Sequence, residues 1–322
     1  MFAVTAARFD ADNPISGLEL GEHAEPAAAD GWTTVTVRAA SLNHHDVWSL
    51  RGVGLSADRL PMILGCDAAG IDEDGNEVVV HAVIGDPAVA GGDETFDPSR
   101  SLLSERHDGT FAERVAVPRR NLVPKPAALS FEEAACLPTA YLTAFRMLFD
   151  RAPVGPGSTV LVQGAGGGVA TALILLGRAA GYRMWATSRS EAKRARALQV
   201  GADQVFETSA RLPERVDAVM ETVGEATWAH SLRALKPGGT VVISGATSGS
   251  VPPADLSRVF FLQLSVIGST MGTRDELARL LMFCEQTGTR PLIDRVMPLS
   301  QAPEGFAAMI GGEVFGKVVF TL

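Results

Sequence analysis

The stretch that decides the fold is Val160-Leu161-Val162-Gln163-Gly164-Ala165-Gly166-Gly167-Gly168-Val169-Ala170. A short apolar run breaks into a cluster of glycines, and the cluster opens into an apolar segment of helical character. This order predicts a strand, a tight turn and a helix that together bind the pyrophosphate of a dinucleotide. Backbone approaches a phosphate closely only where side chains are absent, and a helix N-terminus offers unpaired N–H groups and a positive dipole.

The end of the next predicted strand indicates which dinucleotide is bound. An NAD site would carry a carboxylate there for the ribose hydroxyls, whereas this chain has Ser188 and Arg189, with Lys193 about one helical turn later. A guanidinium pairs with a phosphate through two parallel hydrogen bonds. We therefore predict that the segment binds the 2′-phosphate of NADP(H). The alternative is a solvated basic helix, since two further arginines follow.

Composition narrows the class of protein. The 322 residues suffice for two domains, and 46% hydrophobic with 20% charged residues is typical of a globular enzyme. A net charge of −9 argues against binding to nucleic acid or an anionic membrane. No apolar run approaches the roughly 20 residues of a membrane helix. The three cysteines are far apart, which predicts reduced thiols in the cytoplasm and excludes a cysteine-rich zinc lobe.

The first 125 residues have mainly β-strand patterns. Thr33–Ala39 alternates polar and apolar residues, and Glu77–His81 is a second β-branched run. Frequent glycine and proline indicate long connections, and Gly85–Asp108 is predicted to be a loop. This region is predicted to be a β-barrel-like domain.

From Ser130 onward, strands and helices alternate, which predicts an α/β fold with a parallel sheet. Ser130 and Glu133 form a predicted capping box before a helix over Ala134–Phe149. The predicted strands are Thr159–Gln163, Arg183–Thr187, Asp203–Phe206, Ala218–Thr222, Thr240–Ser244 and Ser265–Gly268. The further predicted helices are one that ends near Ala180, then Glu191–Val200, Ala226–Leu235 and Arg274–Thr287. The last stretch, Leu292–Leu322, is predicted to form short strands around a small helix and to return to the first domain.

Several motifs in order carry a resemblance to a known family. They are Ser41-Leu42-Asn43-His44-His45-Asp46, Leu64-Gly65-Cys66-Asp67-Ala68-Ala69-Gly70, Asp108-Gly109-Thr110-Phe111-Ala112-Glu113, Leu137-Pro138-Thr139-Ala140-Tyr141-Leu142-Thr143-Ala144, the glycine cluster, Ala186-Thr187-Ser188-Arg189-Ser190 and Gly316-Lys317-Val318-Val319. Over essentially its whole length the chain resembles the medium-chain dehydrogenase/reductase superfamily, in its zinc-independent quinone-oxidoreductase-like branch.

The resemblance implies two domains and a cofactor between them. Residues 1–125 and 289–322 would form a GroES-like catalytic domain of β-barrel type. Residues 126–288 would form a Rossmann domain, a doubly wound parallel sheet, with NADP(H) in the cleft. Many members form homodimers by pairing the strand that matches Ser265–Gly268.

The same resemblance, with the glycine and arginine segments, names the expected cofactor residues. They are Thr143, Ala165, Gly166, Gly167, Gly168, Val169, Ser188, Arg189, Lys193, Val223, Ser244, Gly245 and Lys317. Ala170 stands where the family usually has glycine, and we expect the packing of helix on strand to accept its methyl group.

Zinc-dependent relatives use a cysteine, a His-Glu pair and a second cysteine as the catalytic metal ligands. The matching positions here are Asn43, Cys66-Asp67 and Ala140. Neither the amide of Asn43 nor the methyl group of Ala140 replaces a thiolate, and catalytic zinc normally has three protein ligands. We therefore predict no metal, and the plain interpretation of Cys66 is a small buried thiol.

One alternative metal set stays open. His44 and His45 could complete a non-standard zinc site with Cys66 and Asp67. Adjacent histidines on an extended segment point in opposite directions, so only one is expected to reach the other two residues.

Without a metal, the expected chemistry is hydride transfer from NADPH to a quinone or a conjugated enone or carbonyl, with the protein supplying position and polarity. The predicted catalytic residues are Asn43, as a hydrogen-bond donor, His45, as a proton donor, and Asp46. Structural roles stay open for His45, and Asp46 is equally expected to brace the following turn. Trp48 and Cys66 are expected to line the substrate pocket.

Two other functions remain as alternatives: a zinc-dependent alcohol dehydrogenase, and an NADPH-binding sensor with little catalysis. The substrate itself is left open, because loops such as Gly52–Leu60 and Gly245–Leu256 shape the pocket and pattern does not place them. The expected partners are a small-molecule substrate and a second copy of the chain, with neither nucleic acid nor membrane.

Overall fold

The computed structural model describes residues 1–322, which divide into two compact units. The first unit is Met1–Leu142 with Met271–Leu322, and the second is Thr143–Thr270. These units differ from the expected domain ranges, because residues 126–142 and 271–288 belong to the first unit. The helices of these two segments, α2 (Phe131–Ala135) and α8 (Arg274–Thr287), contact strands of the first unit.

The first unit is built on a seven-stranded sheet of order β10-β6-β5-β3-β18-β17, with β9 paired to β3. Its strands are β3 (Trp32–Ser41), β5 (Asp67–Asp72), β6 (Glu77–Val80), β9 (Arg114–Pro118), β10 (Leu122–Pro124), β17 (Ile293–Pro298) and β18 (Lys317–Thr321). A second sheet holds β1 (Phe2–Ala6), β2 (Leu18–Glu22) and β4 (Met62–Ile63). The core between these elements includes Phe111, Phe306 and Phe320, whose rings meet edge to face.

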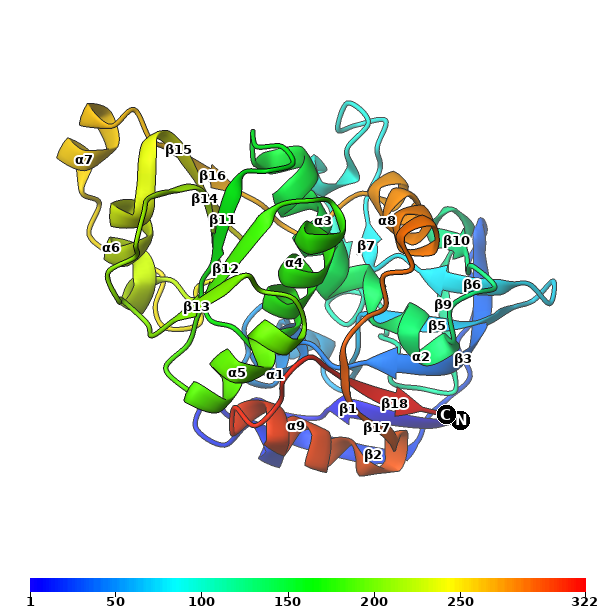
Figure 1. Cartoon of the computed structure of the whole chain (residues 1–322). Coiled ribbons are helices and arrows are strands. Elements are labelled where there is room, and N and C mark those ends of the chain that lie inside the picture. Colours follow the sequence, from blue (N-terminus) through cyan, green and yellow to red (C-terminus); the bar gives the residue numbers. More distant parts are fainter. The chain divides into compact units, whose positions relative to one another are not determined.

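The C-terminal strand closes the first unit. β18 pairs antiparallel with β3, so that Val319 lies opposite Ser41. Figure 1 shows this red strand beside the blue N-terminal strands. The predicted return of the chain end to the first domain is confirmed. The small helix predicted near the end is α9 (Ala302–Ile310).

The second unit is a six-stranded parallel sheet of order β13-β12-β11-β14-β15-β16. Numbered from its first strand, this is the order 3-2-1-4-5-6 of a doubly wound dinucleotide fold, which confirms the predicted Rossmann sheet. The strands are β11 (Thr159–Val162), β12 (Arg183–Thr187), β13 (Gln204–Phe206), β14 (Val216–Glu221), β15 (Leu235–Ile243) and β16 (Ser265–Gly268). The helices α4 (Gly168–Ala179), α5 (Glu191–Gln199) and α6 (Glu225–Ala234) connect them on both sides of the sheet (Figure 1).

One predicted helix needs correction. The single helix expected over Ala134–Phe149 begins earlier, at Phe131, and alternates α-turns with two π-helical segments, Leu137–Tyr141 and Met147–Arg151. Pro138 is one physical reason, because a proline lacks the N–H of a regular helix and its ring crowds the preceding turn. The predicted capping box is confirmed: the Ser130 hydroxyl accepts the N–H of Glu133, 3.1 Å away, and the Glu133 carboxylate accepts the N–H of Ser130.

The sequence did not predict α7 (Leu256–Phe261), a six-residue helix capped by the Asp255 carboxylate. Its length is too short for helical periodicity to show. The predicted loop Gly85–Asp108 also contains a short strand, β8 (Ser101–Leu102), paired with β7 (Val83–Ile84). The strands and helices predicted for the second unit agree with the structure to within about five residues at their ends. None of the helices is both long and apolar enough to cross a bilayer.

The buried His81, directly after β6, contacts the backbone just before α8. The Nε2 of His81 lies 2.9 Å from the carbonyl oxygen of Gly272, and its Nδ1 has no hydrogen-bond partner. Burial lowers the pKa of His81, and the charges of Arg120 and Arg274 lower it further, against the opposing effects of Gly272 and the Glu94 carboxylate. His81 is therefore held neutral in the folded protein.

We expect this histidine to make the protein acid-sensitive. The pKa of an unfolded histidine is about 6.5, so below that pH the unfolded chain binds a proton that folded His81 resists. Its contribution to stability is complete above about pH 6.5 and is lost progressively below it. Urea unfolding of wild type and His81→Gln at several pH values checks this: the variant should lose less stability on acidification. Equal losses would contradict it.

Candidate functional site

The glycine turn joins the end of β11 to the start of α4 in the second unit. Gly164 and Gly166 have φ angles of 79° and 119°, a region that favours glycine. Gly167 is the N-cap of α4 and makes no side-chain capping bond, and a Cβ added to it would meet nothing within 4 Å. The turn therefore presents bare backbone at a helix N-terminus, as a bound pyrophosphate requires.

The usual third glycine of this motif has a substitute further along the helix. Ala170 is buried in α4 without disturbing the helix. About two helical turns later, a Cβ added to Gly177 would collide with the side chain of Met184 on β12. Close packing of helix on strand thus depends on Gly177, and the methyl group of Ala170 is accommodated as expected.

A buried polar network supports the turn from below. Gln163, directly before it, accepts the Thr187 hydroxyl at 2.6 Å, and its amide lies 2.9 Å from His230 Nδ1 and 3.0 Å from Ser231 Oγ. Ser231 in turn donates to the Glu221 carboxylate at 2.6 Å. Burial lowers the pKa of His230, which leaves its Nδ1 free to accept. The sequence analysis missed Gln163 and Glu221, although each is a polar residue at the end of an apolar strand.

The end of β12 carries the residues predicted to bind the 2′-phosphate. Ser188 is nearly buried, and Arg194 donates to its carbonyl oxygen at 2.7 Å. Arg189 is exposed and has no ion pair, so its guanidinium is available to a ligand. Lys193 lies in the first turn of α5, where its N–H caps on Ser190 Oγ at 3.3 Å. Arg194 therefore braces the segment, whereas Arg189 presents its charge.

The other predicted cofactor residues of the second unit follow the neighbouring strands. Val223 lies two residues after the end of β14, and the Glu221 carboxylate accepts its N–H at 2.8 Å. Ser244 and Gly245 follow β15, and the Ser244 hydroxyl is buried without a partner. Strands of a parallel sheet end at one edge, so these residues share the carboxyl edge with the glycine turn, where doubly wound sheets bind ligands. Thr143 is buried in α3 (Leu142–Arg146).

In the first unit, the predicted catalytic residues surround the start of α1 (His44–Leu50). The Asp46 carboxylate accepts the N–H of Asn43 at 2.9 Å and that of Gly65 at 3.1 Å. The expectation of an extended segment through His44 and His45 is therefore wrong, because this capping box starts a helix at His44. Asp46 is fully buried and braces the turn, which is one of the two roles left open for it.

The side chain of Asn43 contacts both members of a buried ion pair, Lys317 and Asp67. Lys317 Nζ lies 2.6 Å from Asn43 Oδ1, 2.9 Å from the Leu42 carbonyl oxygen and 3.4 Å from Asp67 Oδ2. Asp67 Oδ2 also accepts the Ser41 hydroxyl at 2.7 Å and the Asn43 amide at 2.8 Å, while Asp67 Oδ1 has no partner. The ammonium of Lys317 is thus neutralised within the first unit, and its predicted contact with the cofactor stays a prediction.

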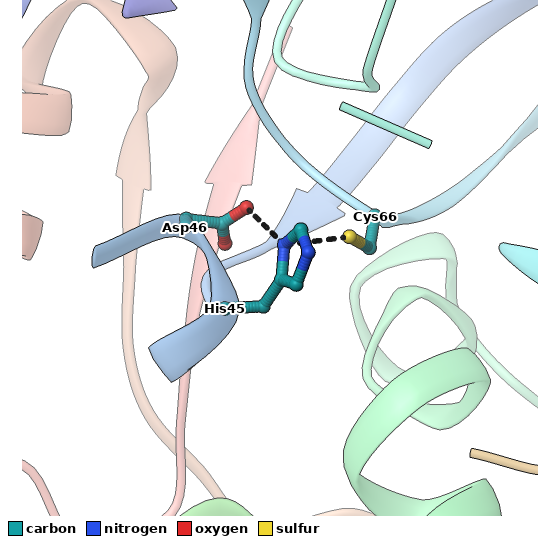
Figure 2. A group of neighbouring side chains, drawn as sticks. All are labelled: His45, Asp46 and Cys66. Carbon is teal, nitrogen blue, oxygen red and sulfur yellow. Dashed lines mark hydrogen bonds and ion pairs between the residues drawn. The ribbon is translucent and has the colours of Figure 1, made fainter. Parts of the chain in front are cut away.

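His45 connects the predicted site to a residue that the sequence analysis missed. Its Nδ1 lies 3.3 Å from Cys66 Sγ and 4.0 Å from Asp46 Oδ1, and Figure 2 shows these three side chains together. Its Nε2 lies 3.2 Å from Glu105 Oε1. Glu105 lies in the connection 85–108, whose path no local pattern predicts. Cys66 Sγ also lies 3.3 Å from the Leu103 carbonyl oxygen.

These contacts set the protonation of the group. Burial raises the pKa of the Cys66 thiol, and His45 only partly offsets this effect. Burial also lowers the pKa of His45, but the charge of an ionised Cys66 and hydrogen bonds with Asp46, Cys66 and Glu105 raise it well above 6.5. Although burial raises the pKa of Glu105, the hydrogen bonds from His45 and the Leu102 N–H outweigh it and lower that pKa. The Glu105 carboxylate therefore lies 3.2 Å from an imidazole whose pKa the surrounding groups raise.

The two residues expected to line the pocket are partly committed elsewhere. Trp48 is half-buried, and the Arg51 guanidinium lies 5.1 Å from its ring centroid. Cys66 is fully buried, so a substrate would reach its sulfur only after the surrounding residues move.

The residues at the family's zinc positions do not fit that metal. The amide of Asn43 is bound to Lys317 and Asp67, and Ala140 offers no ligand atom. Only Cys66 remains as a soft donor, against the three protein ligands of catalytic zinc. The non-standard set also needs correction, because Asp67 pairs with Lys317, and it is Asp46 that joins the remaining cluster.

We expect Lys317→Met to cost about 3–5 kcal/mol of unfolding free energy, because it leaves the Asp67 carboxylate buried and unpaired. Chemical denaturation of the purified variant measures this loss. The double variant Lys317→Met/Asp67→Asn should recover part of it, since the charge is removed as well. A single variant as stable as wild type would show that the pair is not important for folding.

Comparisons with known proteins agree with this architecture. Residues 29–127 match a model described as alcohol dehydrogenase GroES-like domain, and residues 168–286 match one described as zinc-binding dehydrogenase. An acryloyl-coenzyme A reductase of Metallosphaera sedula is 29% identical over 95% of this chain and 96% of its own.

Two solved structures are also similar over nearly the whole chain. An NAD-dependent alcohol dehydrogenase is 34% identical, with a TM-score of 0.92 and full coverage of both chains. A 2-octenoyl-CoA carboxylase reductase, solved with NADP and 2-octenoyl-CoA, is 25% identical, with a TM-score of 0.90 over 99% of this chain and 87% of that one.

Proposed function

Because the chain belongs to the medium-chain dehydrogenase/reductase superfamily, we propose that it is an NADPH-dependent reductase of conjugated carbonyl compounds or quinones. The observation that carries the proposal is the carboxyl edge of the Rossmann sheet. There a bare glycine turn caps α4, and an unpaired Arg189 stands where an NAD site would have a carboxylate.

The relatives differ in their cofactor. One similar structure is named NAD-dependent, and another was solved with NADP. The chemistry at the end of β12 favours NADP for this chain, because Ser188 and Arg189 offer donors and positive charge to a 2′-phosphate. A carboxylate, which would repel that phosphate, is lacking at these two positions.

The named substrates of the relatives favour a conjugated acceptor. Acryloyl-CoA and 2-octenoyl-CoA both carry a carbon–carbon double bond next to a thioester carbonyl. The bound nicotinamide would supply the hydride, and the protein's part is to orient the acceptor and deliver a proton. In such a step the hydride adds to the β-carbon of the double bond, and the α-carbon, next to the carbonyl, takes the proton.

Of the three residues predicted to be catalytic, His45 is the most exposed, with 18% of its side chain accessible, whereas Asn43 and Asp46 are buried. We assign it the hydrogen bond or proton to the acceptor. Asn43 and Asp46 act as positioning residues, because their polar atoms hold Lys317, Asp67 and the start of α1.

The deciding experiment follows NADPH oxidation against a panel of enones, quinones, enoyl thioesters and aldehydes, with NADH in parallel. Turnover of conjugated acceptors with NADPH supports the proposal. Preference for NADH, or turnover of simple aldehydes alone, would contradict it. NADPH binding without any turnover would instead favour a sensor.

Arg189→Ala should weaken the binding of NADPH by about 1.5–3 kcal/mol, the value of a charge-assisted hydrogen bond, and leave the binding of NADH nearly unchanged. Titration of both cofactors into wild type and variant measures this. Arg211→Ala, which removes another exposed arginine of the second unit, is the matched control and should leave both affinities as they are. An equal loss for both cofactors in Arg189→Ala would show that Arg189 does not bind the phosphate.

His45→Gln should lower kcat by about 10²–10⁴-fold if this residue delivers the proton. The variant keeps a polar side chain of similar size, and an unchanged KM for NADPH would show that the cofactor site is intact. Steady-state kinetics on metal-free enzyme are the measurement. A wild-type kcat would assign the proton to solvent.

One observation favours a zinc-dependent alcohol dehydrogenase as the second candidate: His45, Asp46 and Cys66 could hold a metal ion. We propose that the reaction proceeds without a catalytic metal, because the donors at the family's zinc positions are missing. Chelator-treated enzyme should keep its activity, and activity that disappears with the metal and returns with zinc would favour the alternative.

We further propose a homodimer in the cytoplasm. β16 is the edge strand of the Rossmann sheet, and it is largely exposed. On α7, Phe260 and Phe261 are 68% and 80% exposed, which is unusual for side chains of this type. A second copy that pairs along β16 would cover them, and a monomeric mass in solution would contradict this.

The proposal of a cytoplasmic location is supported by the cysteines. Three free buried cysteines agree with a reducing compartment.

A further inference from the structure

We propose that His45, Asp46 and Cys66 bind one soft divalent cation, such as Zn²⁺, through a ligand set different from that of the zinc-dependent relatives. The three residues lie in the first unit, at the start of α1 and directly before β5 (Figure 2). The inference does not rest on the proposed reductase activity, because metal binding itself can be measured.

The distances already approach those of a metal centre. One ligand atom of each residue lies within 4.8 Å of the other two, with 3.3 Å between Cys66 Sγ and His45 Nδ1 and 4.0 Å between His45 Nδ1 and Asp46 Oδ1. Tetrahedral zinc, with bonds of about 2.0–2.3 Å, places its ligand atoms about 3.4–3.7 Å apart. Shifts below about 1 Å would therefore suffice, and the fourth position stays open to water or another small ligand.

The second observation that points to a metal is the position of Glu105. Histidines that bind a metal through one ring nitrogen usually donate the other N–H to a carboxylate, which fixes the ring and raises its basicity. His45 has this arrangement, with Nδ1 toward Cys66 and Nε2 3.2 Å from Glu105 Oε1. Glu105 is itself held, because its Oε2 accepts the N–H of Leu102 at 2.9 Å.

The charges balance in such a complex. In the complex Cys66 binds as a thiolate and His45 as a neutral imidazole, and any protons that these two groups carried go to solvent. The thiolate and the Asp46 carboxylate then offset the two positive charges of the cation. Asp46 keeps its bonds to the N–H groups of Asn43 and Gly65, since a carboxylate has lone pairs for both. His45, with its exposed surface, marks the side from which a cation enters.

Filling the site would also affect the proposed reaction. A cation on His45 Nδ1 removes the proton that we assign to the acceptor. We therefore expect Zn²⁺ to inhibit the metal-free reductase.

The test uses the full chain, stripped with a chelator and then supplied with Zn²⁺ or Co²⁺. We expect one ion per chain by elemental analysis. The Co²⁺ form should show the absorption of a thiolate-to-metal charge transfer, which requires a cysteine ligand. No uptake, or Co²⁺ bound without that absorption, would overturn the proposal.

Three variants locate the site. Cys66→Ala should abolish the charge-transfer absorption, whereas Cys284→Ala, the matched control, removes another buried thiol and should leave it unchanged. Glu105→Gln should weaken metal binding about 10–100-fold while the absorption remains, as for other carboxylates that support a ligand. Wild-type affinity in either Cys66→Ala or Glu105→Gln would overturn the assignment. If Cys66→Ala does not fold, the wild-type Co²⁺ spectrum and Glu105→Gln still decide it.

The outcomes separate this site from the proposed function. Metal-free turnover of conjugated acceptors together with stoichiometric metal binding supports both proposals. Turnover without metal binding removes only the site. Metal binding without metal-free turnover removes only the proposed metal-independent reaction.

Discussion

The candidate site of the first unit depends on one buried ammonium. Lys317, near the C-terminus, lies within hydrogen-bond distance of Leu42 and Asn43 and 3.4 Å from Asp67. A buried charge must be paired, so β18 stays docked beside β3, with its Lys317 near Asp67 at the start of β5. Asn43 is held by this pair and is also the N-cap of α1. The direction in which α1 leaves the sheet, and hence the position of His45, follows from the same contacts.

The aspartates Asp46 and Asp67 have different roles in the first unit, and so do the adjacent histidines His44 and His45. Asp67 balances the charge of Lys317, whereas Asp46 accepts the backbone N–H groups of Asn43 and Gly65. His44 is exposed, whereas His45 reaches Cys66 and Glu105. Because a helix turns successive residues by about 100°, only one of the two histidines faces the cluster. The same cluster that orients a proton donor in the metal-free protein supplies three ligand atoms to a cation, which connects the two proposals through His45.

The second unit shows how a sheet prepares a site before any ligand binds. The parallel strands β11, β12, β14 and β15 all end at one edge of the sheet. A buried network of hydrogen bonds from Gln163 through Ser231 to Glu221 connects the ends of β11 and β14. Arg194 donates a hydrogen bond to the carbonyl oxygen of Ser188, whereas the exposed Arg189 has no such contact. Specificity for the phosphate thus depends on one side chain that the fold itself does not need.

The sequence by itself determined the alternation of strands and helices in the second unit, the glycine turn, the Ser130 capping box and Arg189 at the end of β12, because each depends on neighbours within a few residues. It also predicted no zinc at the family's positions, since neither the amide of Asn43 nor the methyl group of Ala140 replaces a thiolate. Only the tertiary structure decided the roles of Asp46, Glu105 and Lys317. Lys317 meets Asn43 from 274 positions away, and Glu105 meets His45 from 60 positions away. Such contacts arise from strand pairing and from the paths of long connections, which leave no periodic pattern in the chain.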